Sequence, residues 1–278
     1  MAAFCVLVLS WAGWAQGAAT IEERFARAEA AFAQRYEEAW MQVAIGEYEE
    51  ILETLDPSDS AQRAVVLNRL AQLCYETTTF SPGDTAEDRT WFARGKAYGL
   101  ESLRLNPEFA RLEAEEFCAA VSRVTDPAAL LWTANNWGGL CGMNPIEGLL
   151  QSGNVRLLYE RCLAVEESYW GASAHNALGA MRMVAPSTLG GDPAAAAAHL
   201  EAAIALAPEY LINRVVRTQY VGFSYDFFGQ VFGVCDAAFI ERELRAVRDA
   251  EIGEWPFWNR EAKKEAEALL RQLAELMP

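Results

Sequence analysis

The sequence predicts an all-α fold, a helical-repeat solenoid of antiparallel helix pairs with a C-terminal capping helix. Three observations predict it. Apolar residues recur at helical spacing, one type of helix end returns at intervals, and no run of alternating apolar and polar residues is bounded by hairpin turns. A chain of 278 residues that is 52% hydrophobic is long enough to bury a large core.

The first eighteen residues are typical of a cleaved secretory signal. Residues 1–18 carry no charge, and their apolar run ends in the small and polar stretch Ala15-Gln16-Gly17-Ala18. The run is too short to span a membrane, and a buried N-terminal helix is the alternative. Cys5 precedes the apolar run, so it does not form a lipobox. Residues 19–278 are expected to form a single helical-repeat domain.

Apolar periodicity predicts the helices of this domain. A face that runs from Phe25 to Val43 predicts one long helix from Ile21, which Gly46 ends. A short helical run then stops at Asp56-Pro57, because proline has a fixed φ and no N–H. Further helices are expected at residues 61–75, 89–105, 127–137, 155–165, 170–184, 194–206 and 259–277, with capping helices within residues 236–278.

Four segments share one kind of helix end, namely residues 52–60, 103–110, 162–170 and 203–211. Counting from Pro57 to Pro107, Glu167 and Pro208 gives steps of 50, 60 and 41 residues. These steps exceed the about 34 residues of a tetratricopeptide unit. The units are therefore expected to be tetratricopeptide-like with insertions, which Gly, Pro, Ser and Thr clusters predict at residues 76–88, 138–153 and 185–193.

Composition argues against a nucleic-acid partner and against catalysis. A formal net charge of -16 lacks the clustered cations that phosphate binding needs. His175 and His199 are the two histidines, and neither completes a catalytic triad. We expect His175 to be a hydrogen-bonded packing residue and His199 to lie at the surface or in a groove. Widely spaced cysteines predict no metal site, and no cofactor is expected.

The segment LLWTANNWGG at residues 130–139 is the strongest candidate for a binding site. Two large aromatic residues and two amides surround much of one helix, and aromatic walls with a few oriented polar groups are typical of small-molecule pockets. An aromatic pair that begins the next helix is expected to face the same groove. Ordinary packing between helices explains these residues equally well. The candidate ligand-binding residues are Trp132, Asn135, Asn136, Trp137, Tyr169 and Trp170.

Three other segments are distinctive. In the loop TLGGDP, Asp192 is expected to cap a helix whose first turn contains Pro193. Aromatic residues gather at residues 220–232 and 255–258. Both aromatic segments are interpreted as core, with a partner-docking patch as the alternative.

Together these motifs resemble one family. The order of ALLWTANNWG (129–138), a repeat end with an aromatic pair, the loop APSTLGGDP (185–193) and the helix AHLEAAIAL (198–206) is similar to the TatT family. These are periplasmic T-components associated with tripartite ATP-independent periplasmic (TRAP) transporters. The similarity covers about residues 61–211, and the segment after Tyr220 matches no part of the family pattern.

The resemblance implies a non-enzymatic periplasmic accessory protein of a solute uptake system. It implies a homo-oligomer, with a trimer as one candidate state, and docking of the solute-binding P-component. It also implies a cavity or pore for a small hydrophobic or carboxylate-bearing ligand. Carried over with the ligand candidates are Gly138, Gly190, Gly191 and Asp192 as structural motif residues. Many family members resemble lipoproteins, and this chain departs from them because it has no usable lipobox. The alternative is a tetratricopeptide scaffold for envelope assembly that binds an extended peptide.

Overall fold

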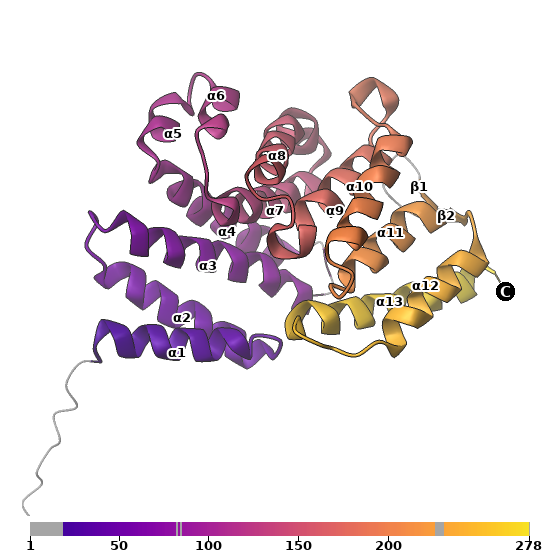
Figure 1. Cartoon of the computed structure of the whole chain (residues 1–278), viewed down its shortest axis with the longest axis horizontal. Coiled ribbons are helices and arrows are strands. Elements are labelled where there is room, and N and C mark those ends of the chain that lie inside the picture. Colours follow the sequence, from indigo (N-terminus) through magenta and orange to yellow (C-terminus); the bar gives the residue numbers. More distant parts are fainter. Residues whose placement is uncertain (1–18, 82, 84, 226–230, 278) are drawn as a thin grey trace, which may run out of the picture.

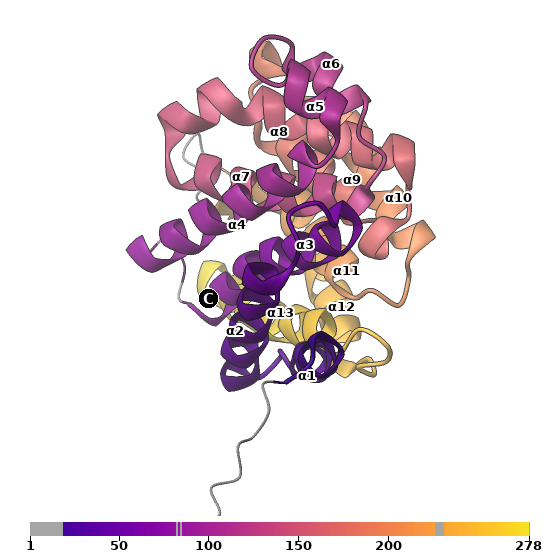
Figure 2. The ribbon, with the colours of Figure 1, turned by 90° about the vertical axis from the view of Figure 1, so that its left-hand side faces the viewer.

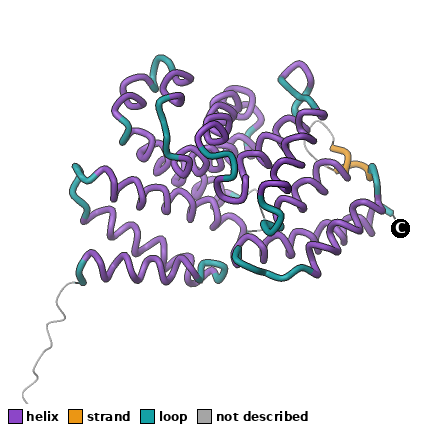
Figure 3. Tube along the Cα trace, in the orientation of Figure 1, coloured by secondary structure: helices purple, strands orange, loops and turns teal. Residues whose placement is uncertain are grey.

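The computed structural model describes residues 19–81, 83, 85–225 and 231–277 (Figure 1). The predicted signal, residues 1–18, lies outside them. The described residues confirm the all-α prediction with thirteen α-helices and two short 3-10 helices, η1 and η2 (Figure 3). The helices are α1 (Ile21–Ala33), α2 (Glu38–Thr54), α3 (Ser60–Thr77), α4 (Ala86–Arg104), α5 (Pro107–Leu112), α6 (Phe117–Ser122), α7 (Pro127–Met143), α8 (Pro145–Val165), α9 (Tyr169–Val184), α10 (Pro193–Leu206), α11 (Ile212–Gly222), α12 (Ala237–Asp249) and α13 (Pro256–Leu276), with η1 (Thr78–Phe80) and η2 (Ser187–Leu189).

Local sequence explains where many of these helices begin. Four of them, α5, α7, α8 and α10, follow an Asn or Asp whose side chain accepts backbone N–H groups of the first turn, and each has proline near its first position. Proline is tolerated there because the first N–H groups of a helix have no partner within it. At α10, Asp192 accepts from the N–H groups of Ala194 and Ala195, as predicted.

Successive helices pack on one another along most of the chain. Helix α4 also packs directly on α7, although the short helices α5 and α6 separate the two in the sequence. The last helix also returns to the first ones. Phe257 at the start of α13 belongs to the hydrophobic cluster of α1, α2 and α3, and Figures 1 and 2 show α13 beside these helices. A repeat in a solenoid contacts only its neighbours. The contact between the two ends of the described chain departs from that rule.

The single long helix predicted from Ile21 to Gly46 is wrong. The chain turns at residues 34–37, and α2 then continues through Gly46. The turn directs Arg35 to the buried carboxylate of Glu76, a tertiary contact that local periodicity does not reveal. Glycine within a helix costs only about 1 kcal/mol relative to alanine. That cost is too small to end a well-packed helix.

The insertion predicted at residues 138–153 is also wrong, because α7 and α8 occupy most of it. Two of its glycines allow close packing. A Cβ at Gly139 would lie 2.6 Å from the Phe92 ring, and one at Gly148 would lie 2.9 Å from the Cys141 carbonyl oxygen. Residues 185–193 contain the expected loop, in which Gly190 has a φ of 91°.

Strands were not predicted, yet β1 (Phe223–Tyr225) and β2 (Val231–Val234) pair antiparallel in the aromatic segment. Phe223 is buried with α11, α12 and α13, which explains why this short pairing forms at the edge of a helical core. The five cysteines within the described range are all free. No helix in that range has both the length and the apolar character of a membrane span.

Candidate ligand-binding site

The structure brings part of the predicted site together. Trp132 on α7 is 1% exposed, and its ring packs edge-on against Trp170 at a centroid distance of 5.3 Å. Tyr169 lies against Trp170 at 6.3 Å. These three aromatic residues therefore form one contiguous group.

The second amide of the motif has a packing role. Asn136 is fully buried between α7, α3 and α4, where its Nδ2 donates to the carbonyl oxygens of Ala71 at 2.8 Å and Trp132 at 2.7 Å. Its Oδ1 lies against Gly95, where a Cβ would come within 2.1 Å. Asn136 therefore ties helices together, in the manner of the packing alternative.

The remaining motif residues face α8, in the case of Asn135 and Gly138, or α6 and α4, in the case of Trp137. The Oδ1 of Asn135 accepts a hydrogen bond of 2.8 Å from the Tyr159 hydroxyl. Trp137 packs edge-on against Phe117, and the Lys96 ammonium lies 3.8 Å from its ring centroid. Burial lowers the pKa of Lys96, against the opposing charge of Glu147. Gly138 lies against α8, where a Cβ would make an ordinary contact of 3.6 Å with Tyr159.

The loop motif lies apart from these residues and has a backbone role. A Cβ at Gly191 would come within 1.8 Å of the Ala185 carbonyl oxygen, so only glycine fits there without a shift. Gly190 adopts a left-handed φ, and Asp192 caps α10. The three residues shape the entry to α10.

The backbone at the start of α9 is strained. Trp170, Gly171 and Ala172 have φ angles of 49°, 64° and 59°, so the first part of α9 contains a left-handed turn. Non-glycine residues in this conformation cost about 1–2 kcal/mol each. Tyr210 packs so closely on Gly171 that a Cβ would come within 2.3 Å of its ring. Strain of this kind persists only where the surroundings enforce it, and it clusters at functional sites.

A cavity of about 150 Å³ adjoins this turn. It lies where α9 meets the N-terminal helices and the start of α13, and its walls are mainly aromatic. Trp170 packs edge-on against Trp255 at 5.5 Å in its lining. The indole Nε1 of Trp170 is buried and has no hydrogen-bond partner in the described part of the chain. The cavity is lined by Arg35, Trp170, Glu254, Trp255, Pro256, Phe257 and Trp258.

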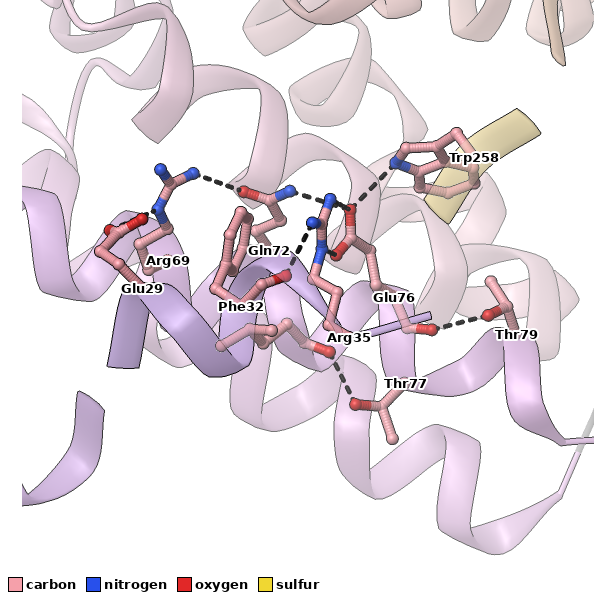
Figure 4. A network of polar contacts seen from close by, with 10 residues as sticks. Glu29, Phe32, Arg35, Arg69, Gln72, Glu76, Thr77, Thr79 and Trp258 are labelled. Carbon is pink, nitrogen blue, oxygen red and sulfur yellow. Dashed lines mark hydrogen bonds and ion pairs between the residues drawn. The ribbon is translucent and has the colours of Figure 1, made fainter. Parts of the chain in front are cut away.

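Arg35, which lines the cavity, belongs to a buried ion pair with Glu76 (Figure 4). The Nε of Arg35 lies 2.6 Å from Glu76 Oε2, and Glu76 is fully buried. Glu76 Oε1 also accepts from Gln72 Nε2 at 2.8 Å and from Trp258 Nε1 at 2.9 Å. A buried charge needs both an opposite charge and hydrogen bonds. This network gives both to the Glu76 carboxylate, and the pair with Glu76 neutralises the charge of Arg35.

The aromatic surroundings of the cavity are strongly desolvated. Burial raises the pKa of Tyr75 to about 12, with further contributions from Tyr220 and the charge of Glu76. Burial also raises the pKa of Tyr210 well above its ordinary value. Both phenols therefore stay neutral at physiological pH. Glu254, at the exposed rim, is the carboxylate that lines the cavity outside the ion-pair network.

These walls suit a small solute. Pockets for drug-sized ligands measure about 300–1,000 Å³, so a cavity of about 150 Å³ fits only a few non-hydrogen atoms. Aromatic walls favour an apolar part, and the unpaired indole N–H of Trp170 favours a hydrogen-bond acceptor. A wider depression of about 360 Å³ lies between α4 and α7, and it is lined by none of the predicted residues.

Sequence reasoning missed Arg35 and gave residues 255–258 no part in this site. An isolated arginine carries no motif, and its pairing with Glu76 depends on a turn that periodicity did not predict. The aromatic segment at residues 255–258 was the feature of the sequence that could have pointed to this site. The described residues contain no group of three or more side chains suited to a metal ion.

The fold and this cavity define an all-α protein with an aromatic cavity where α9, the N-terminal helices and the start of α13 meet. A family model described as TRAP transporter T-component, TatT, matches residues 88–277. The chain belongs to this family and is therefore an accessory component of TRAP transporters. The match includes α12 and α13, which lie beyond the part of the sequence that resembles the family by its motifs. A comparison with curated proteins found no match.

Proposed function

We propose that this chain is a non-enzymatic periplasmic component that binds a small solute in the Trp170 cavity and docks the solute-binding P-component of a TRAP transporter. The observation that carries the ligand site is the aromatic cavity that Trp170 lines beside a left-handed turn, and the buried indole N–H of Trp170 has no hydrogen-bond partner among the described residues. The solute has an apolar part and an accepting oxygen, as in a short carboxylate.

The wider organisation follows the family. In this proposal residues 1–18 are a secretory signal, residues 19–278 form one domain of tetratricopeptide-like helix pairs, and the mature chain is a homo-oligomer such as a trimer. Trp132 and Tyr169 support Trp170 from behind. Asn135, Asn136 and Trp137 hold α7 to its neighbours, and so keep Trp132 in place.

Isobutyrate is a suitable probe because it combines a small apolar group with a carboxylate, and isobutanol is its uncharged counterpart. Calorimetric titration at pH 7.5 compares the parent protein with Trp170→Phe, which deletes the N–H and keeps an aromatic ring. Loss of one hydrogen bond to a charged group, about 1.5 kcal/mol, corresponds to about tenfold weaker binding. Trp40→Phe, at an exposed position on α2, serves as the matched control.

Equal binding by the parent and Trp170→Phe would sink the ligand site. Native mass spectrometry with the P-component of the same transporter tests docking separately. A complex with an extended peptide, but none with the P-component, would favour the scaffold function instead.

A further inference from the structure

The two histidines of the chain contact each other. His175 on α9 and His199 on α10 bring their Nδ1 atoms to 2.9 Å, and His175 Nε2 lies 3.2 Å from Glu167 Oε1. His175 is buried and hydrogen-bonded, as the sequence predicted, while His199 is half-buried in this contact. The contact therefore joins α9 both to α10 and to the turn before α9.

The number of protons that this contact tolerates is limited. Because the Glu167 carboxylate only accepts, His175 Nε2 carries a hydrogen, and in the neutral pair His199 Nδ1 donates to His175 Nδ1. With one added proton on the pair, one of the two facing Nδ1 atoms still donates and the other still accepts. A second proton places hydrogens on both facing Nδ1 atoms and two positive charges side by side. The contact must then open.

Neighbouring groups set the pH at which this happens. Burial lowers the pKa of His199 below its ordinary 6.5, with further lowering by His175 and by Arg182 of α9, while Glu160 of α8 opposes them. From α11, which packs on α9, uncharged Asn213 meets Asn176. His199 is therefore harder to protonate than an ordinary histidine side chain.

The histidine contact is linked to the strained turn of the ligand site. Glu167 and His175 flank Trp170, Gly171 and Ala172 in the sequence. Asn213 Nδ2 donates to the Gly171 carbonyl oxygen at 3.0 Å and to the Ala203 carbonyl oxygen of α10 at 2.8 Å. A displacement of α10 therefore reaches the carbonyl group that anchors the turn.

We propose that His175 and His199 are positioning residues, a latch that holds Trp170 at the cavity with no or one added proton and releases it with a second. Opening separates α9 from α10 and lets the left-handed turn relax, so the strain already present favours release. This inference rests on the proposed function, because it regulates the same solute site. It gives the protein retention near neutral pH and release in acid.

Nuclear magnetic resonance of the full chain without ligand tests the latch. The tryptophan indoles and histidine rings are labelled, Trp170→Phe assigns the Trp170 signal, and pH is lowered from 7.5 to 5. The Trp170 indole signal is expected to shift with the midpoint of His199. In His199→Asn, whose amide contacts His175 without titrating, the Trp170 signal is expected to stay at its neutral position. An unchanged Trp170 titration in that variant would overturn the proposal.

Two charge variants keep the histidine pair intact. Arg182→Gln is expected to move the shared midpoint of His199 and Trp170 to higher pH, and Glu160→Gln to lower pH. The proposal would also be overturned if the titration midpoint of the Trp170 signal stayed the same while the midpoint of His199 moved in both variants. Isobutyrate binding at pH 7.5 tests the solute site independently, so failure of the latch and failure of the proposed function are distinguishable.

Discussion

The indole N–H of Trp258 donates a hydrogen bond of 2.9 Å to Glu76 Oε1, across 182 residues of sequence. This bond joins the start of α13 to α3 (Figure 4), and Trp258 also lines the Trp170 cavity. The two ends of the described chain are therefore held together at the site itself.

Glu76→Gln is expected to destabilise the fold by about 3–5 kcal/mol, because it leaves the buried Arg35 without its opposite charge. Urea denaturation measures the effect. Glu101→Gln is the control, since the Glu101 side chain is 46% exposed in its pair with Arg63, and an ion pair with an exposed carboxylate contributes less than about 1 kcal/mol. Similar losses in the two variants would contradict the role of the buried network.

Gly95→Ala and Gly99→Ala are expected to destabilise the protein by about 1–3 kcal/mol through overpacking. A Cβ at these positions would lie 2.1 Å from Asn136 Oδ1 and 2.2 Å from Thr133 Oγ1. Gly46→Ala is the matched control, because a Cβ there meets no described atom within 4 Å. It is expected to stabilise α2 by up to about 1 kcal/mol, so thermal unfolding should show opposite signs.

Ala172→Gly and Ala174→Gly separate backbone strain from packing. Both alanines are buried on α9, but only Ala172 has a left-handed φ. Glycine relieves that conformation, so Ala172→Gly is expected to cost at least about 1 kcal/mol less than Ala174→Gly. Chemical denaturation measures the difference, and equal costs would mean that the turn is unstrained.

The free energy of unfolding is expected to fall as pH decreases below 6.5. Burial lowers the pKa of His199 in the folded protein, so the unfolded chain binds more protons in this range. The contribution of His199 to stability is fully present above pH 6.5 and is lost as pH falls through the lowered pKa of His199. Urea midpoints at pH 7.5 and 5.5 measure the loss, and the part due to His199 should disappear in His199→Asn.

Part of the candidate site could be predicted because its signal is local. Trp132 and Trp170 were identified from the kinds of residue that line pockets, and the structure places them in contact. Asn136 was drawn into the same prediction by its spacing, yet it faces α3 and α4, because the direction of a side chain on a helix depends on which neighbours surround it.

Neighbouring residues alone were enough to specify the all-helical class, the Asp192 cap of α10 and the family, since periodicity, caps and motifs are local properties of a chain. Three features of the site could be known only after folding: the chain turns at Arg35, Trp258 reaches Glu76, and Trp170 begins a left-handed turn. Each depends on contacts between segments that are distant in the sequence. These contacts form only when the chain folds, and they then outweigh the local preferences of the backbone.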